Sequence, residues 1–124
     1  MVAICVDDHP IQLYGLKNSV RRALPDCRVY VFTETREAIA CAMKYGCDVL
    51  LCEIELYNGN GIQLAEEIQK LNPRVNIIFV TVCDEREYAR DVLRLKPSGY
   101  LTKPASREKV ARELQNLRYP VLGR

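Results

Sequence analysis

The feature that most constrains the fold is a fivefold alternation of short apolar runs with longer segments of helical periodicity. The run Val2–Val6 is apolar at every position, as expected of a strand that helices cover on both faces. Four further strands are expected at 28–33, 48–54, 75–82 and 98–102. A helical pattern follows each strand, and this alternation favours parallel βαβ units. The sequence therefore predicts an α/β fold with a doubly wound, five-stranded parallel sheet.

Turn and capping signals mark where these elements begin and end. Pro10 suits the first turn of a helix, and Gly46 is well placed to end one. The stretch 55–61 holds two Gly and two Asn and is expected to be a loop. Asp84 with Glu87 resembles the capping box that starts a helix. Right-handed crossovers restrict such a sheet to a few strand orders, of which we expect 2-1-3-4-5.

Length and composition narrow the class of protein. A chain of 124 residues has the size of one domain, and 48% hydrophobic with 27% charged residues is typical of a folded globular protein. The net charge of +2 gives no indication of nucleic-acid binding. No apolar run approaches the roughly 20 residues that span a bilayer, and the opening MVAICVDDHP lacks a signal peptide's pattern. We expect a soluble, unsecreted domain without membrane contact.

Cysteine and histidine usage limits the chemistry. His9 is the only histidine in the sequence, which excludes a metal site built from several histidines. The six cysteines form no C-x-x-C pair, and three of them lie in or next to expected strands. Six cysteines also permit three disulfides, but cysteine behaves as a small hydrophobe and is often buried. We therefore expect buried reduced thiols and a cytoplasmic location.

Polar side chains gather where the expected strands end. Asp7 and Asp8 follow the first strand, Glu53 ends the third with Glu55 two residues on, Thr81 ends the fourth and Lys103 follows the fifth. In open parallel sheets the site lies beyond the carboxyl ends of the strands. Clustered carboxylates suit Mg²⁺, and a lysine with a hydroxyl suits phosphoryl oxygens. The set predicts a Mg²⁺-dependent phosphoryl site.

Each of these residues alone has a simpler explanation. Asp7 and Asp8 can cap the following helix, Thr81 can be an ordinary strand residue, and Lys103 can be a surface charge. Their shared position at one sheet edge favours a joint site. His9 is better explained as a loop or capping residue than as a catalyst.

Four segments carry a family resemblance: VAICVDDHP, DVLLCEIELYNGNG, NIIFVTV and GYLTKP. They resemble the signature segments of the response-regulator receiver domain of two-component signalling, over about residues 2–118. The resemblance implies a flavodoxin-like or CheY-like fold and a signalling module that is not an enzyme. The chain would then be either a stand-alone receiver or one joined to a transcriptional output domain, to which residues 119–124 would be a linker stub.

The resemblance further implies a role for each site residue. The paired acids Asp7 and Asp8 would bind Mg²⁺, together with Glu53 and the backbone carbonyl of Glu55. Thr81 and Lys103 would contact the phosphoryl group. Tyr100 would change rotamer on activation, so that Thr81 and Tyr100 together would form the switch. The peptide bond before Pro104 is expected to be cis.

One position departs from the family pattern. The family's phosphoacceptor is an aspartate, and the residue that matches it here is Glu53, while Tyr57 replaces a proline often found in the following loop. Glutamate carries one more methylene, and a displacement of about 1 Å can cost on the order of 100-fold in rate. The longer side chain can also place its carboxylate nearer Lys103 and Thr81, which would imitate part of a phosphorylated aspartate.

Three hypotheses follow for function. The chain is a receiver that accepts a phosphoryl group slowly on Glu53, or a receiver-like module that works without phosphorylation because Glu53 biases it toward the active arrangement. The third, a flavodoxin-like nucleotide or flavin binder, is disfavoured because no glycine-rich loop follows the first strand.

The resemblance names partners outside this chain. A sensor histidine kinase would supply the phosphoryl group, and a linked DNA-binding domain would be the output. A homodimer would form through the fourth helix, fifth strand and fifth helix. Arg86, Arg90 and Arg94 recur on that fourth helix, where a solvated face is favoured over a docking patch. We expect no direct nucleic-acid contact by these residues.

Overall fold

The computed structural model describes residues 1–121. Its five long strands are β1 Val2–Val6, β2 Arg28–Phe32, β3 Val49–Cys52, β6 Asn76–Thr81 and β7 Gly99–Thr102. All four neighbouring pairs are parallel, in the order β2-β1-β3-β6-β7. This is the predicted order 2-1-3-4-5 when the five long strands are counted along the chain, so the predicted fold class is confirmed.

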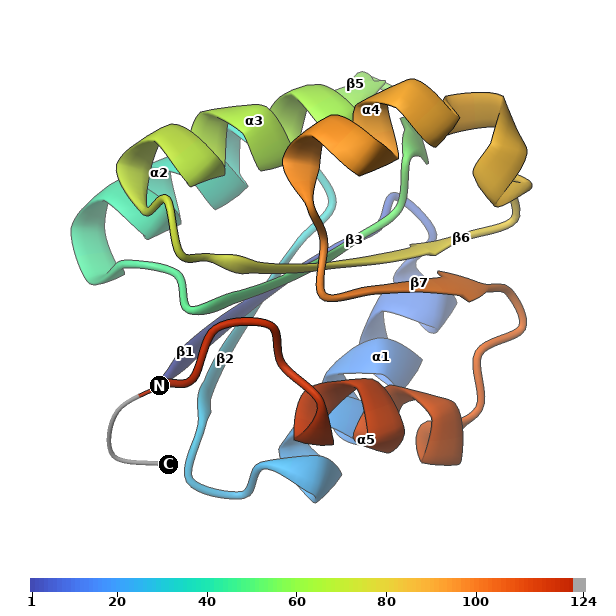
Figure 1. Ribbon diagram of the computed structural model, residues 1–124. Helices are drawn as coiled ribbons and strands as arrows, with labels where there is room; N and C mark the ends of the chain where they lie inside the picture. The colour runs from blue at the N-terminus through green and yellow to red at the C-terminus, as the bar shows by residue number, and fades with distance from the viewer. Residues whose placement is uncertain (122–124) are drawn as a thin grey trace.

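Helices cover both faces of the sheet (Figure 1). They are α1 Pro10–Ala23, α2 Thr35–Tyr45, α3 Gly61–Leu71, α4 Ala89–Leu95 and α5 Arg107–Gln115. Helices α1 and α5 pack on one face, while α2, α3 and α4 pack on the other. The three central strands β1, β3 and β6 are buried at every position, which explains their nearly continuous apolar sequence.

The expectation for the chain after β3 was wrong. The stretch 55–61, expected to be a loop, contains a small antiparallel pair of strands, β4 Glu55–Leu56 and β5 Gly59–Asn60. Gly59 has φ of +142°, a conformation that other residues rarely adopt, and the reversal it permits pairs the two strands. Asn60 then caps α3 by accepting hydrogen bonds from the backbone N–H groups of Ile62 and Gln63.

The helix expected after Asp84 begins later than predicted. The capping box of Asp84 and Glu87 is present, but it starts a 3₁₀ turn, η1 Glu85–Tyr88, and α4 begins only at Ala89. A capping box specifies where the chain turns into helical geometry but not the hydrogen-bond spacing that follows. The expected strand 48–54 is also shorter, so Glu53 lies just beyond β3.

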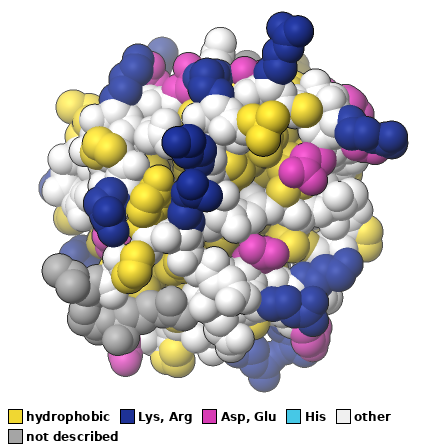
Figure 2. All heavy atoms as spheres, in the orientation of Figure 1, with side chains coloured by type: hydrophobic (Ala, Val, Ile, Leu, Met, Phe, Trp, Pro, Cys, Tyr) yellow, Lys and Arg dark blue, Asp and Glu magenta, His cyan; other side chains and the backbone are white. Residues whose placement is uncertain are grey.

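The remaining features agree with the sequence. The six cysteines are free thiols, and burial is the main cause that raises the pKa of each, to about 12 for Cys5. The Lys103–Pro104 bond is cis. Within residues 1–121 no helix has the length and apolar character needed to cross a membrane. Basic and acidic side chains are interspersed on the face that Figure 2 shows.

The predicted linker stub 119–124 is described in part. Tyr119 is hydrogen-bonded through its backbone N–H and carbonyl to the side chain of Asn76, at the amino end of β6. Its ring also lies 5.1 Å from the guanidinium of Arg74. The chain is therefore attached to the sheet one residue beyond the predicted boundary at 118. Residues 122–124 of the stub lie outside the described residues.

Candidate functional site

The predicted site residues meet at the carboxyl edge of the sheet. Asp7 directly follows β1, Glu53 directly follows β3, Thr81 ends β6 and Lys103 directly follows β7. Because β6 lies between β3 and β7, the Lys103 side chain extends past the end of β6 to reach the carboxylates. The backbone N–H of Lys103 donates to the carbonyl of Thr81 at 2.7 Å, which fixes where this side chain starts.

Lys103 is the centre of the polar cluster. Its Nζ lies 2.6 Å from Asp7 Oδ2, 2.8 Å from Glu53 Oε1 and 2.5 Å from Gln12 Oε1. An ammonium has three donors, so each one is used. Burial by itself lowers the pKa of Lys103, but the hydrogen bonds that its ammonium donates to Asp7 and Glu53 outweigh burial and raise that pKa above its ordinary value. Lys103 therefore carries its charge with only 10% of its side chain exposed.

Glu53 is held through both of its oxygens. Oε1 pairs with Lys103, while Oε2 accepts from the backbone N–H of Ile54 at 2.7 Å and, more weakly, of Glu55 at 3.4 Å. The residue is buried. The expected approach to Lys103 is present, but within residues 1–121 no hydrogen bond joins Glu53 to Thr81. The carboxylate is thus oriented toward the ammonium and not toward the hydroxyl.

Asp8 is incompletely satisfied. Its Oδ2 accepts from the backbone N–H of Tyr57 at 2.5 Å, whereas its buried Oδ1 has no hydrogen-bond partner among the described residues. His9 Nδ1 lies 3.1 Å from that oxygen but outside hydrogen-bonding geometry. Ligand atoms of Asp7, Asp8 and His9 all lie within 4.8 Å of one another. A buried carboxylate oxygen without a partner is costly unless a cation or water supplies one.

The helix-capping explanation for the paired acids does not hold. His9 occupies the N-cap position of α1, and no side chain caps that helix. Asp7 instead accepts from the backbone N–H of His9 at 3.0 Å and from Lys103. His9 is therefore a capping-position residue with an exposed ring, as the sequence indicated, and Asp7 belongs to the charge cluster.

A glycine allows the loop after β3 to lie close to Glu53. A Cβ added at Gly61 would lie 2.0 Å from the carbonyl oxygen of Glu53 and 2.9 Å from the Cα of Ile54. Real Cβ atoms do not approach backbone this closely, so only glycine fits. The backbone N–H of Gly61 also donates to the carbonyl of Ile54 at 2.7 Å. Together these contacts fix the chain that carries Glu53 and Glu55.

The two predicted switch residues are joined by the backbone of Cys83. Thr81 Oγ1 accepts from the N–H of Cys83 at 3.2 Å, and the Tyr100 hydroxyl donates to the carbonyl of Cys83 at 2.9 Å. The Tyr100 ring packs on Phe79, with centroids 6.1 Å apart. Burial, followed by the charges of nearby acidic groups, raises the pKa of Tyr100. A movement at Thr81 would thus reach Tyr100 through the backbone of a single residue, Cys83.

Sequence reasoning missed three contributors. Gln12 lies two residues after Pro10, one helical turn beyond Asp8, and that spacing is the signal that could have placed it at the site. The N–H groups of Tyr57 and Cys83 carry no such signal, because a backbone group has no residue identity. Glu55, proposed to offer its carbonyl, has an exposed side chain that accepts from the Tyr88 hydroxyl at 3.3 Å.

Comparison with known proteins gives consistent matches. The family model "Response regulator receiver domain" matches residues 3–115. The transcriptional regulatory protein DegU of Brevibacillus brevis is 29% identical over 81% of this chain and 42% of its own length. The transcriptional regulatory protein LytR of Staphylococcus aureus is 24% identical over 95% of this chain and 47% of its own length. The chain thus spans about half the length of these relatives.

A solved structure of similar sequence has the same fold. The isolated REC domain of RcsB from Salmonella enterica serovar Typhimurium, determined with the phosphomimetic BeF3⁻, is 26% identical. It superposes with a TM-score of 0.80 and covers 93% of this chain and 86% of its own.

Proposed function

Because the chain belongs to the response regulator receiver domain family, we propose that it is the receiver module of a transcriptional regulator, with Glu53 at the phosphoacceptor position. The observation that carries this proposal is the ammonium of Lys103 held between Asp7 and Glu53 at the carboxyl edge of the sheet. A cation at this position would neutralise the oxygens of an incoming phosphoryl group, and the hydroxyl of Thr81 would donate to one of them.

We further propose Mg²⁺ as the cofactor. Asp7 and Glu53 contact one ammonium and Asp8 lies close to Asp7, so three carboxylates exceed one positive charge, and this surplus negative charge suits a divalent cation. The partnerless Oδ1 of Asp8 is the observation that favours a metal over a closed ion-pair network. Asp7, Asp8, Glu53 and the backbone carbonyl of Glu55 would hold the ion. It would supply positive charge to the oxygens of the transferring phosphoryl group.

Glutamate makes the transfer slow in this proposal. An oxygen of Glu53 would attack phosphorus, the bond from phosphorus to the donor would break, and the donor would leave with that electron pair. Both oxygens of Glu53 are engaged, one by Lys103 and one by backbone N–H groups, so the attacking oxygen must first be freed. The phosphorylation-independent alternative is not favoured, since the relatives are transcriptional response regulators.

Intact mass spectrometry after incubation with acetyl phosphate and Mg²⁺ tests this proposal. We expect slow gain of one phosphoryl mass by the native protein, at least tenfold faster gain by Glu53→Asp, and none by Glu53→Gln. The matched control is Glu55→Gln, which leaves the proposed carbonyl ligand in place and should react like the native protein. Failure of both the native protein and Glu53→Asp to gain mass would refute the phosphoryl site.

Partners and regulation follow from the same proposal. A sensor histidine kinase would be the phosphoryl donor, and a DNA-binding domain after residue 118 would be the output, both in the cytoplasm. The active form would dimerise through α4, β7 and α5, with Thr81 and Tyr100 as the switch. This domain would contact neither nucleic acid nor membrane itself. Sedimentation of Glu53→Asp before and after phosphorylation tests the dimer.

A further inference from the structure

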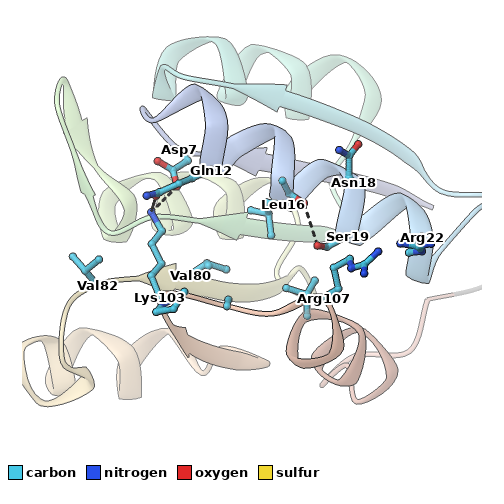
Figure 3. Close-up of a pocket in the computed structure, with 14 residues that line it drawn as sticks. Asp7, Gln12, Leu16, Asn18, Ser19, Arg22, Val80, Val82, Lys103 and Arg107 are labelled. Atoms are coloured by element: carbon cyan, nitrogen blue, oxygen red, sulfur yellow. Dashed lines mark hydrogen bonds and ion pairs between the residues drawn. The ribbon is translucent and has the colours of Figure 1, made fainter.

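A large cavity leaves the proposed phosphoryl site and runs between α1 and α5 (Figure 3). Asp7 and Lys103 line one end of the cavity. Arg22 and Arg107 line the other end, away from Lys103, as Figure 3 shows. Its volume is about 980 Å³, at the upper end of the roughly 300–1,000 Å³ found for small-molecule sites. The space exceeds what a phosphoryl group and a metal ion occupy, so the phosphoryl site alone does not account for it.

The middle of the cavity is apolar. Leu16 from α1, Val80 from β6 and Val110 from α5 line it, and all three belong to the hydrophobic core on this face of the sheet. Ser19 also lines it, but its hydroxyl already donates to the carbonyl of Gly15 at 3.1 Å. A ligand in this stretch would therefore bury hydrocarbon against these three side chains, while the exposed Asn18 is a further polar residue of α1 that lines the cavity.

Gly15 keeps the wall of the cavity open. It lies inside α1, and a Cβ added there would meet no atom within 4 Å. Neither a turn nor a close approach requires glycine at this position, and glycine weakens a helix interior relative to alanine. Gly15 therefore leaves open space in the cavity wall, which a larger side chain at this position would occupy.

The far end of the cavity is cationic. Arg22 and Arg107 also line a smaller adjoining cavity, so their side chains border the same space. Neither forms an ion pair with any residue in 1–121. Arg107 is the first residue of α5, where the helix dipole adds positive potential. Glu108 borders the smaller cavity and is the acidic residue closest in sequence to Arg107.

From this arrangement we propose that the cavity between α1 and α5 binds a small amphipathic organic anion, a carboxylate or phosphate monoester with an apolar body. The anionic group lies between Arg22 and Arg107, and the apolar body lies on Leu16, Val80 and Val110. Because Asp7 and Lys103 line the other end, an occupied cavity alters the surroundings of the Lys103 ammonium. The ligand would thus influence the phosphoryl site from outside it.

The test is an NMR titration of the ¹⁵N-labelled protein with octanoate and octyl phosphate, with octanol as the neutral control. We expect both anions to give saturable shifts of amide signals in α1 and α5, and octanol to bind at least tenfold more weakly. Gly15→Leu should abolish the shifts by filling the cavity, with a thermal midpoint at or above that of the native protein. Arg22→Gln with Arg107→Gln should weaken octanoate binding at least tenfold, while Lys109→Gln, outside the cavity lining, should not.

Three results would overturn the proposal. Octanol binding as tightly as octanoate would remove the role of the arginines, and octanoate shifts that persist in folded Gly15→Leu would place the ligand elsewhere. Absence of any saturable shift with either anion would show that the cavity does not bind this class of ligand. All three results come from ligand titrations, so they do not depend on whether Glu53 is phosphorylated.

Discussion

Buried polar groups lie at both ends of strand β6, but those at one end are neutral and those at the other end are charged. At the amino end, Asn76 donates to the carbonyls of Asp48 and Tyr119 and accepts from Ser98 and from the N–H of Tyr119, all without charge. At the carboxyl end, the Lys103 ammonium contacts two carboxylates and the amide oxygen of Gln12, and Asp8 Oδ1 has no hydrogen-bond partner within residues 1–121. A fully satisfied neutral network holds the fold together, whereas the unsatisfied charged one is the part suited to bind a ligand.

The largest expected effect is at the charged end. Lys103→Met removes the cation between Asp7 and Glu53 and leaves two buried carboxylates facing each other. We expect a loss of about 3–5 kcal/mol in unfolding free energy, measured by urea denaturation at pH 7. The double variant Lys103→Met with Glu53→Gln should recover part of this loss because one carboxylate is then neutral. A loss below about 1 kcal/mol would mean that water already screens the cluster.

A smaller loss is expected at the neutral end. Asn76→Ala removes both partners of the Tyr119 backbone and one of the two donors to the Asp48 carbonyl, which keeps the backbone N–H of residue 76. We expect a loss of about 1–3 kcal/mol in unfolding free energy by the same denaturation measurement. Asn116→Ala is the matched control, since its side chain makes one exposed bond to the carbonyl of Arg112 and should change stability by less than about 0.5 kcal/mol. If the two variants behave alike, the network at Asn76 is not what fixes Tyr119.

The smallest expected effect is at an exposed ion pair, where charge acts without burial. Asp84 lies in the loop after the same strand and is exposed. The hydrogen bonds that it accepts from the side chain and backbone of Arg86 lower its pKa from 3.8 to about 2. A lowered pKa in the folded state stabilises the protein above pH 3.8, and this contribution is lost as the pH falls through about 2. Thermal midpoints of native protein and Asp84→Asn should differ slightly at pH 7 and converge near pH 2.

Addition of 1 M salt should reduce that difference at pH 7, because exposed ion pairs are screened. A difference between the two proteins that persists at pH 2 would assign the effect of Asp84 to helix initiation alone and not to its charge.

More of the site side chains could be predicted from the sequence than of the loops and backbone groups that hold them. Asp7, Glu53, Thr81 and Lys103 could be placed together because each follows or ends a strand, and parallel strands present their carboxyl ends at one edge. The hairpin within 55–61 could not be predicted, since Gly and Asn favour turns of many kinds and only the contact with Glu53 selects this one. The backbone hydrogen-bond partners of Asp8, Thr81 and Tyr100 could not be predicted from the sequence either.

By itself the sequence determined the five alternating strands and helices, the two-sided burial and the edge at which the polar residues meet, because hydrophobic periodicity can be read locally along the chain. It restricted the strand order to a few possibilities, of which the structure has the expected one. Only the tertiary structure decided that Lys103 carries three partners, that Asp8 lacks one, and that Gly15 opens a cavity ending at Arg22 and Arg107. These depend on distances between residues far apart in the chain. Such distances are fixed by packing, which no residue specifies alone.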